Sequence, residues 1–267
     1  MITSPWAGRL VRSLLTGAFV TAAALLPASP ASAIEIESSG LTIAATPTLT
    51  SDYLFRGISQ TRNNWATQGT LDVQHTSGFY VGGFVSSAKF LASPSNNTRQ
   101  EIDALAGYRF AVGEVNLDVG YVGYFYPGQT KAPGGQLNEF HELALRANYT
   151  VGIVKLYGAG FYSPNYFGRS GDSFYIEGGA DVTLPFEVTA AGRLGYQWIE
   201  RNPLFGTPDY LNFSVGVSRE IYAGITASIG FAGTNISKRD CAPVAGRADS
   251  GQRICDTRAL FTLSRLF

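Results

Sequence analysis

Few residues in this sequence of 267 amino acids could act at a reacting centre. The chain has two histidines, His75 and His141, and two cysteines, Cys241 and Cys255. A serine hydrolase needs a serine near a histidine and an orienting third group, but the sequence has no Gly-x-Ser-x-Gly and no His-Glu-x-x-His motif. The only pair worth testing for catalysis is His141 beside Glu142. We expect a structural histidine there, and the sequence predicts no enzyme, no cofactor and no metal site.

A second group of candidates consists of charged side chains in otherwise apolar segments. On the inner wall of a membrane barrel they would set ion selectivity, or they would pair across the lumen and plug it. Asp52 and Arg56 would point inward near the external mouth, as an ion-pair network or as two hydrated side chains, and Gly57 would permit a sharp exit into a loop. The lumen candidates are Asp52, Arg56, Asp72, Arg99, Glu101, Asp103, Arg109, Asp118, Glu142, Arg146, Glu177, Asp181 and Arg193.

The segments that carry these charges alternate polar and apolar residues. Side chains switch faces at every strand residue, so each segment is a candidate strand with an apolar outer face and a polar inner face. Phe174 and Ile176, for example, oppose Glu177 and Asp181. The segments match the ~9–11 residues of a tilted transmembrane strand. We expect strands at 42–56, 65–75, 79–91, 99–110, 114–126, 138–150, 153–162, 173–184, 187–199, 209–219, 221–234 and 257–267.

The links between these segments alternate between tight turns and long loops. Short turns near 76–78 and 112–113 are each followed by a longer link, at 92–98 and at 127–137. Outer-membrane barrels have such short periplasmic turns and long external loops, whereas a soluble sandwich has no reason to sort its loops. Proline cannot donate to a strand ladder, and after the first 33 residues only Pro47 falls within an expected strand.

Residues 1–33 are typical of a secretory signal peptide. Arg9 and Arg12 form a basic start, an apolar run follows, and Ala31-Ser32-Ala33 predicts cleavage at its end. The apolar run is too short for a membrane anchor, which needs about 20 residues. We therefore expect one mature barrel domain at 34–267.

An exported chain meets an oxidising compartment, where Cys241 and Cys255 favour a disulfide. The bond would close a loop of roughly fifteen residues in the last long link and contribute about 3 kcal/mol by the loop-entropy estimate. The alternative to a disulfide is a metal site, but two thiols without a nearby histidine would be an incomplete set of ligands. The expected role of the disulfide is to keep this loop compact.

The composition is unusual for a soluble domain. Only 15% of the residues are charged, against ~25% in soluble domains. The expected signal peptide holds two of the 20 basic residues and none of the 20 acidic ones, so the mature chain is nearly neutral and predicts no nucleic-acid partner. Aromatic rings at strand ends indicate two bilayer rims in contact with outer-membrane lipid and lipopolysaccharide. They are Trp65 and Trp198 at the external rim and Tyr108, Phe110 and Tyr149 at the periplasmic rim.

The last strand ends on Phe267 and alternates apolar residues, with Arg265 as a departure. This ending resembles the terminal signal that the barrel-assembly machinery reads. The runs Ser51-Asp52-Tyr53-Leu54-Phe55-Arg56-Gly57-Ile58-Ser59-Gln60-Thr61 and Ser77-Gly78-Phe79-Tyr80-Val81-Gly82 resemble the TorF family of porins, also called the Gcw_chp family. The resemblance covers nearly all of the mature chain, including the cysteine pair. It implies an outer-membrane β-barrel with a pore role and no established solute.

The sequence therefore predicts an all-β protein, an antiparallel up-and-down transmembrane barrel of about twelve strands in a Gram-negative outer membrane. We expect a passive pore for small hydrophilic solutes. The alternatives are a non-conducting structural or surface-binding barrel and, after it, an outer-membrane hydrolase. The transported solute, gating, an open or plugged lumen and assembly into a homo-oligomer all stay open, because about twelve strands lie between filled eight-stranded and open sixteen-stranded barrels.

Overall fold

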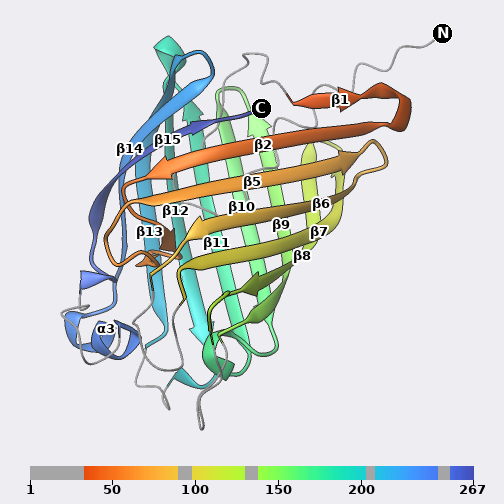
Figure 1. Cartoon of the computed structure of the whole chain (residues 1–267). Coiled ribbons are helices and arrows are strands. Elements are labelled where there is room, and N and C mark those ends of the chain that lie inside the picture. The colour runs from red at the N-terminus through yellow and green to blue at the C-terminus, as the bar shows by residue number, and fades with distance from the viewer. Residues whose placement is uncertain (1–32, 90–97, 130–137, 203–207, 246–252) are drawn as a thin grey trace.

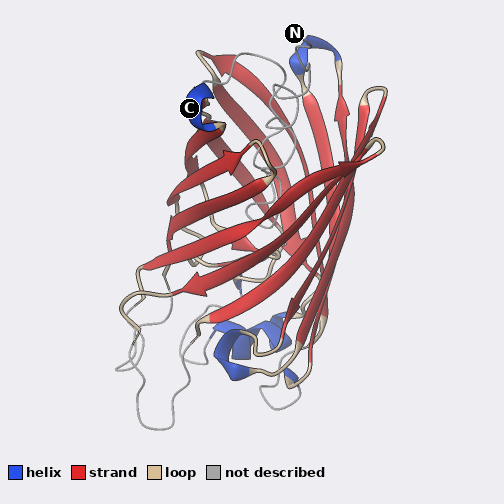
Figure 2. Cartoon of the chain, turned by 90° about the vertical axis from the view of Figure 1, so that its right-hand side faces the viewer, coloured by secondary structure: helices blue, strands red, loops and turns tan. Residues whose placement is uncertain are grey.

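The computed structural model describes residues 33–89, 98–129, 138–202, 208–245 and 253–267. The expected signal peptide lies outside these residues, except for Ala33. Thirteen strands form one antiparallel sheet, in which β1 is a three-residue edge and the other twelve close into a barrel (Figures 1 and 2). The expected fold class is confirmed. No helix among the described residues is long and apolar enough to span a membrane.

The barrel strands follow one another in chain order around the wall. They are β2 (Leu41–Thr50), β5 (Ala66–His75), β6 (Phe79–Ser87), β7 (Gln100–Val112), β8 (Val115–Phe125), β9 (Phe140–Val151), β10 (Val154–Ser163), β11 (Ser173–Thr183), β12 (Thr189–Ile199), β13 (Tyr210–Tyr222), β14 (Ile225–Thr234) and β15 (Arg258–Arg265). The remaining elements are β1 (Ile34–Ile36), β3 (Leu54–Phe55), β4 (Ile58–Ser59), the helix α3 (Lys238–Ala245) and the 3-10 turns Glu37–Ser39, Phe167–Arg169 and Pro185–Glu187. We call the two ends of the barrel the loop end and the turn end, after the links found there.

The barrel closes where the last strand meets the first. Strand β15 pairs with β2 through Thr262 and Thr50, and the backbones of Ala45 and Phe267 exchange two hydrogen bonds of 2.8 Å. Alternate residues of a strand point to the same neighbour, so the missing N–H of Pro47 falls on this β15 side. Pro47 therefore removes one bond from the seam and leaves the pairing of β2 with β5 continuous.

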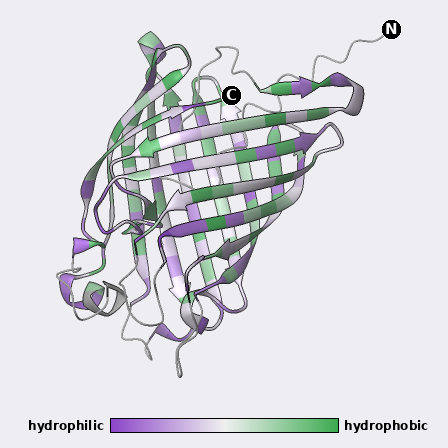
Figure 3. Ribbon diagram, in the orientation of Figure 1, coloured by the Kyte–Doolittle hydropathy of each residue, from purple (hydrophilic) through white to green (hydrophobic). Residues whose placement is uncertain are grey.

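The outer face of the barrel is a belt of exposed apolar side chains. Ile176 and Leu194 on neighbouring strands are 63% and 58% exposed, and bands of different hydropathy follow one another along many strands (Figure 3). Trp65 packs edge to face on Phe261 at the loop end. Contact of this whole apolar belt with water would be unfavourable in free energy. The surface is therefore stable only against lipid or another apolar phase.

The first expected strand is wrong in its second half. Strand β2 ends at Thr50, not at 56, and residues 51–64 fold into the barrel as a segment that we call the lumen hairpin. Its turn places Arg56 at φ 48° and Gly57 at φ 82°, as the two-residue turns favoured in hairpins require. A Cβ on Gly57 would lie 2.7 Å from the carbonyl oxygen of Gly233. Gly57 therefore makes the turn of the hairpin rather than an exit into a loop.

Candidate functional site in the barrel lumen

The lumen hairpin contacts the wall in several directions at the loop end. Tyr53 packs on strands β5 and β6, Leu54 on β14 and β15, Phe55 on β8 and β9, and Ile58 on the segment that carries the disulfide. The hairpin therefore narrows this half of the lumen. The wall residues in these contacts are Ala66, Phe84, Tyr124, Phe140, Tyr210, Ala232 and Leu260.

The tip of the hairpin inserts Arg56 into a buried cage. One nitrogen of its guanidinium donates to both carboxylate oxygens of Glu142, at 2.9 and 2.7 Å, and the other donates to Oε1 of Gln197 at 2.6 Å. The guanidinium carbon lies 4.1 Å from the ring centre of Tyr175 and 5.2 Å from that of Phe161. The site thus combines a charge-assisted double contact with cation–π contacts.

Arg56 stays charged in this buried position. Burial alone would lower the pKa of its guanidinium, but Glu142 and the nearby tyrosines raise the pKa above its ordinary value. Arg56 also has a left-handed backbone, which a non-glycine residue adopts only when its surroundings hold it there. The cage therefore fixes both the charge and the strained turn.

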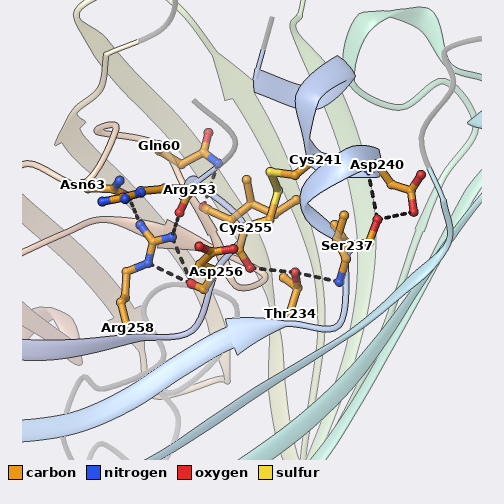
Figure 4. Close-up of a disulfide and its surroundings, with 12 residues drawn as sticks. Gln60, Asn63, Thr234, Ser237, Asp240, Cys241, Arg253, Cys255, Asp256 and Arg258 are labelled. Atoms are coloured by element: carbon orange, nitrogen blue, oxygen red, sulfur yellow. Dashed lines mark hydrogen bonds between the residues drawn. A yellow bond between two sulfur atoms is a disulfide. The ribbon is translucent and has the colours of Figure 1, made fainter. Parts of the chain in front are cut away.

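The base of the hairpin is held by Asp52. Its carboxylate accepts hydrogen bonds of 2.6 Å from the hydroxyls of Ser59 and Thr61. It also pairs with Arg258 at 2.7 Å, from the start of β15. Arg258 in turn donates to the side chain of Asn63 (Figure 4). The hairpin is thereby tied to the last strand of the barrel.

The disulfide lies directly on the hairpin. Cys241 and Cys255 are joined, as expected (Figure 4). Both are fully buried and pack with Ile254 and Tyr210. The backbone N–H of Ser59 donates to the carbonyl of Ile254 at 2.9 Å. The disulfide therefore does more than keep a loop compact, because it supports one side of the lumen hairpin.

Replacing both cysteines by serine, Cys241→Ser and Cys255→Ser, is expected to lower the free energy of unfolding by about 3 kcal/mol, the entropy of a loop of roughly fifteen residues. Urea titration of the folded barrel in detergent, followed by tryptophan fluorescence, measures this loss. Reduced wild-type protein should show the same loss. Equal stability of the oxidised wild type and the double variant would contradict the assignment.

Two carboxyl groups next to the hairpin have no cationic partner within the described residues. Glu101 and Asp103 on β7 are 0% and 1% exposed, and Tyr53 donates its hydroxyl to Glu101. Both carboxylate oxygens of Asp103 are buried without a hydrogen-bond partner among the described residues. With Glu142 they give the described wall of the loop end three carboxyl groups, and Arg56 of the hairpin pairs with Glu142.

A separate network fills the barrel from its middle toward the turn end. Arg109 donates to both oxygens of Asp72, at 2.8 and 2.7 Å. Asp118 lies 3.6 Å from Arg109 and 3.5 Å from Arg146, and it accepts a hydrogen bond of 2.9 Å from Tyr80. Opposite charges thus neutralise one another across the part of the wall from β5 to β9.

Further around the wall, Arg193 pairs with Asp181 at 2.7 Å. Glu177 is half-buried and accepts a hydrogen bond of 2.7 Å from Tyr175.

Arg99, by contrast, lies exposed just before β7, so it does not join the buried charges. The structure therefore brings all the candidates except Arg99 into the barrel interior, although it carries Asp52 and Arg56 on the hairpin and not on the wall.

Several residues of the site were missed in the sequence. Gln197, Tyr175 and Phe161 complete the Arg56 cage, and Arg258 holds Asp52. Alternation predicted that Gln197 and Tyr175 face inward, but they are uncharged, and it did not assign the faces of the strand that carries Phe161. Nothing in the sequence indicated that a guanidinium from a distant segment would reach them.

The histidines lie away from the lumen network. His141 is exposed at the loop end, where Nδ1 is 2.6 Å from the hydroxyl of Tyr121 and the two rings stack. His75 is exposed at the turn end, 2.7 Å from the hydroxyl of Ser77. Glu142 points instead toward Arg56. His141 and Glu142 therefore form no pair of the kind that acid–base catalysis requires.

Comparison of the sequence with protein families gives one match. Residues 35–267 match a sequence model of a family described as "Bacterial protein of unknown function (Gcw_chp)". A comparison with curated proteins at the sequence level gave no match.

Several solved structures share the fold. One described as "KdgM porin" has a TM-score of 0.53 at 14% identity, covering 84% of this chain and 99% of that one. "NanC porin structure in rhombohedral crystal form" has a TM-score of 0.54 at 7% identity, covering 84% and 98%. "KdgM porin in complex with disordered oligogalacturonate" has a TM-score of 0.51 at 12% identity, covering 84% and 97%. At these identities the likeness concerns the barrel fold.

Proposed function

The chain belongs to the Gcw_chp family of bacterial proteins, and from its lumen we propose that it is an outer-membrane channel for passive diffusion of small hydrophilic solutes. The observation that carries this proposal is the polarity of the barrel wall, which has an apolar belt on its outer face and charges of both signs on its inner face. Buried charges need partners or water, and a wall lined by both signs is typical of hydrated pores. The motif around Asp52 resembles that of the TorF family of porins, and this resemblance also implies a pore role.

The lumen hairpin would be the constriction of this channel. It narrows the loop end by its contacts with the wall, and its removal would leave the acidic, aromatic-lined wall around Glu142 open to water. The KdgM structure solved with oligogalacturonate shares the barrel fold, which supports passage of a hydrophilic solute through such a barrel.

A second candidate function is a non-conducting barrel. It is favoured by the same hairpin, which packs against strands on several sides of the wall, and by the neutralised network around Asp118. Such a protein would act through its external loops. A hydrolase is disfavoured, because His141 points away from Glu142.

We further propose that residues 1–33 are removed on export and that the loop end faces outward, with the turn end in the periplasm. Outer-membrane lipid and lipopolysaccharide would cover the apolar belt. The barrel-assembly machinery would read the last strand through Phe267, which is 43% exposed at the turn end. Association into a homo-oligomer is compatible with the apolar belt.

Single-channel recording in a planar bilayer tests the proposed function. Refolded protein should give discrete current steps, and heat-unfolded protein from the same preparation should give none. A gel shift between heated and unheated samples identifies the folded barrel. Folded barrels that never conduct, with or without the hairpin, would overturn the channel and favour the non-conducting alternative.

A further inference from the structure

The Arg56 cage has the composition of a receptor for an organic cation. Its parts on the barrel wall are the carboxylate of Glu142, the amide oxygen of Gln197 and the ring faces of Tyr175 and Phe161. A carboxylate together with aromatic faces is the chemistry that recognises guanidinium and alkylammonium groups. The hairpin supplies Arg56 itself and the ring of Phe55, whose centre lies 4.8 Å from the guanidinium carbon.

The wall around the cage is prepared for positive charge even without the hairpin. Glu142, Glu101 and Asp103 face this half of the lumen, and each is no more than 1% exposed. Arg109 and Arg146 pair with Asp118 nearer the turn end, Arg193 pairs with Asp181, and Arg258 at the loop end pairs with Asp52 of the hairpin. If the hairpin left the lumen, Glu142 would lose its partner Arg56 and would face the lumen beside the carboxyl groups of Glu101 and Asp103.

The cage is also built independently of its occupant. Tyr124 donates to Oε2 of Glu142 at 2.9 Å, which fixes the carboxylate from the neighbouring strand. The side-chain nitrogen of Gln197 donates to the hydroxyl of Ser173 at 2.7 Å, which turns the amide oxygen toward the cage. These bonds lie within the wall, so the receptor geometry should persist when Arg56 is absent.

We propose that this cage is a binding site for the guanidinium or ammonium group of a cationic solute, and that Arg56 occupies it as an internal ligand while the hairpin is seated. The inference rests on the proposed channel and names organic cations as its solute class. A tethered ligand has a high effective concentration, so free cations would bind mainly when the hairpin is displaced. The backbone of Arg56 is strained while the hairpin is seated. The contacts of the cage must therefore hold the hairpin in that position.

Chemical rescue of an emptied cage tests the site. Arg56→Ala barrels should melt at a lower temperature than the wild type, and millimolar propylguanidinium should raise that temperature in a saturable way. Propylurea has nearly the same shape without the charge and should give no comparable rise. The double variant Arg56→Ala with Glu142→Gln is the matched control and should respond to neither compound. Equal responses to the two compounds, or a response that survives in the control, would overturn the site.

A second measurement avoids dependence on the folding of the Arg56→Ala variant. Barrels whose lumen hairpin is replaced by a short Gly-Ser linker should be blocked by propylguanidinium added at the loop end, and Glu142→Gln in that background should remove the block. Conducting barrels without such a block would overturn the site and leave the channel intact. Rescue of melting in barrels that never conduct would support the site and overturn the channel.

Discussion

Replacing Arg56 by alanine is expected to lower the free energy of unfolding by about 3–5 kcal/mol, as breaking a buried ion pair does. The side chains of Arg56 and Glu142 are 4% and 0% exposed. Among the described residues, the substitution leaves the buried carboxylate of Glu142 with the Tyr124 hydroxyl and no cation. Gln197 loses the donor to its amide oxygen as well. Urea titration in detergent measures the change.

Arg201 provides the matched control for removing one positive charge at the same end of the barrel. It pairs with Glu200 at 3.8 Å, and the two side chains are 53% and 50% exposed. Arg201→Ala should change stability by no more than about 1 kcal/mol. Adding Glu142→Gln to Arg56→Ala should restore part of the loss, since the orphaned charge is then removed. A loss for Arg56→Ala as small as that for Arg201→Ala would show that the cage does not hold the hairpin.

The second large loss of stability is expected at Asp118, the centre of the charge network nearer the turn end. Asp118→Asn removes the charge that Arg109 and Arg146 share, and Arg146 has no other ion pair among the described residues. Two nitrogens of Arg146 are already buried without a hydrogen-bond partner. The substitution should therefore lower the free energy of unfolding by about 3–5 kcal/mol. It should also shift ion selectivity toward anions, measured as the reversal potential in a salt gradient.

Asp72→Asn is the control that separates these consequences. In that variant Arg109 keeps Asp118 and the oxygen of Gln74, which lies 2.8 Å away. The loss of stability should be clearly smaller than in Asp118→Asn. If the two losses were equal, Asp118 would not be the shared centre of the network.

The wall of the barrel could be predicted from the sequence because strands in a membrane wall obey one local rule. Alternation around Glu177 and Asp181 fixed which side chains face inward, and sorted link lengths fixed the up-and-down order. The same rule explains the error in the first strand. Residues 51–56 continue the alternation of β2, so Asp52 and Arg56 look like wall positions although the chain has left the wall.

The hairpin and its cage could not be predicted for a different physical reason. The only local sign of the turn is Arg56-Gly57 between apolar residues, and arginine is not a residue that such turns favour. The contacts that stabilise it reach across the barrel to Glu142 and Gln197. Pairing of this kind depends on the three-dimensional lumen and leaves no periodic trace in the sequence.

The most direct test of the constriction is the step size of the wild-type barrel against that of a barrel with residues 52–63 replaced by a short Gly-Ser linker. Both proteins are recorded in the same planar bilayer and salt, after a gel shift has shown that each is folded. The wild-type steps should be small, and the linker variant should give steps several times larger, because the hairpin no longer occupies the loop end. Steps of equal size, or no steps from either folded barrel, would contradict a pore narrowed by this hairpin.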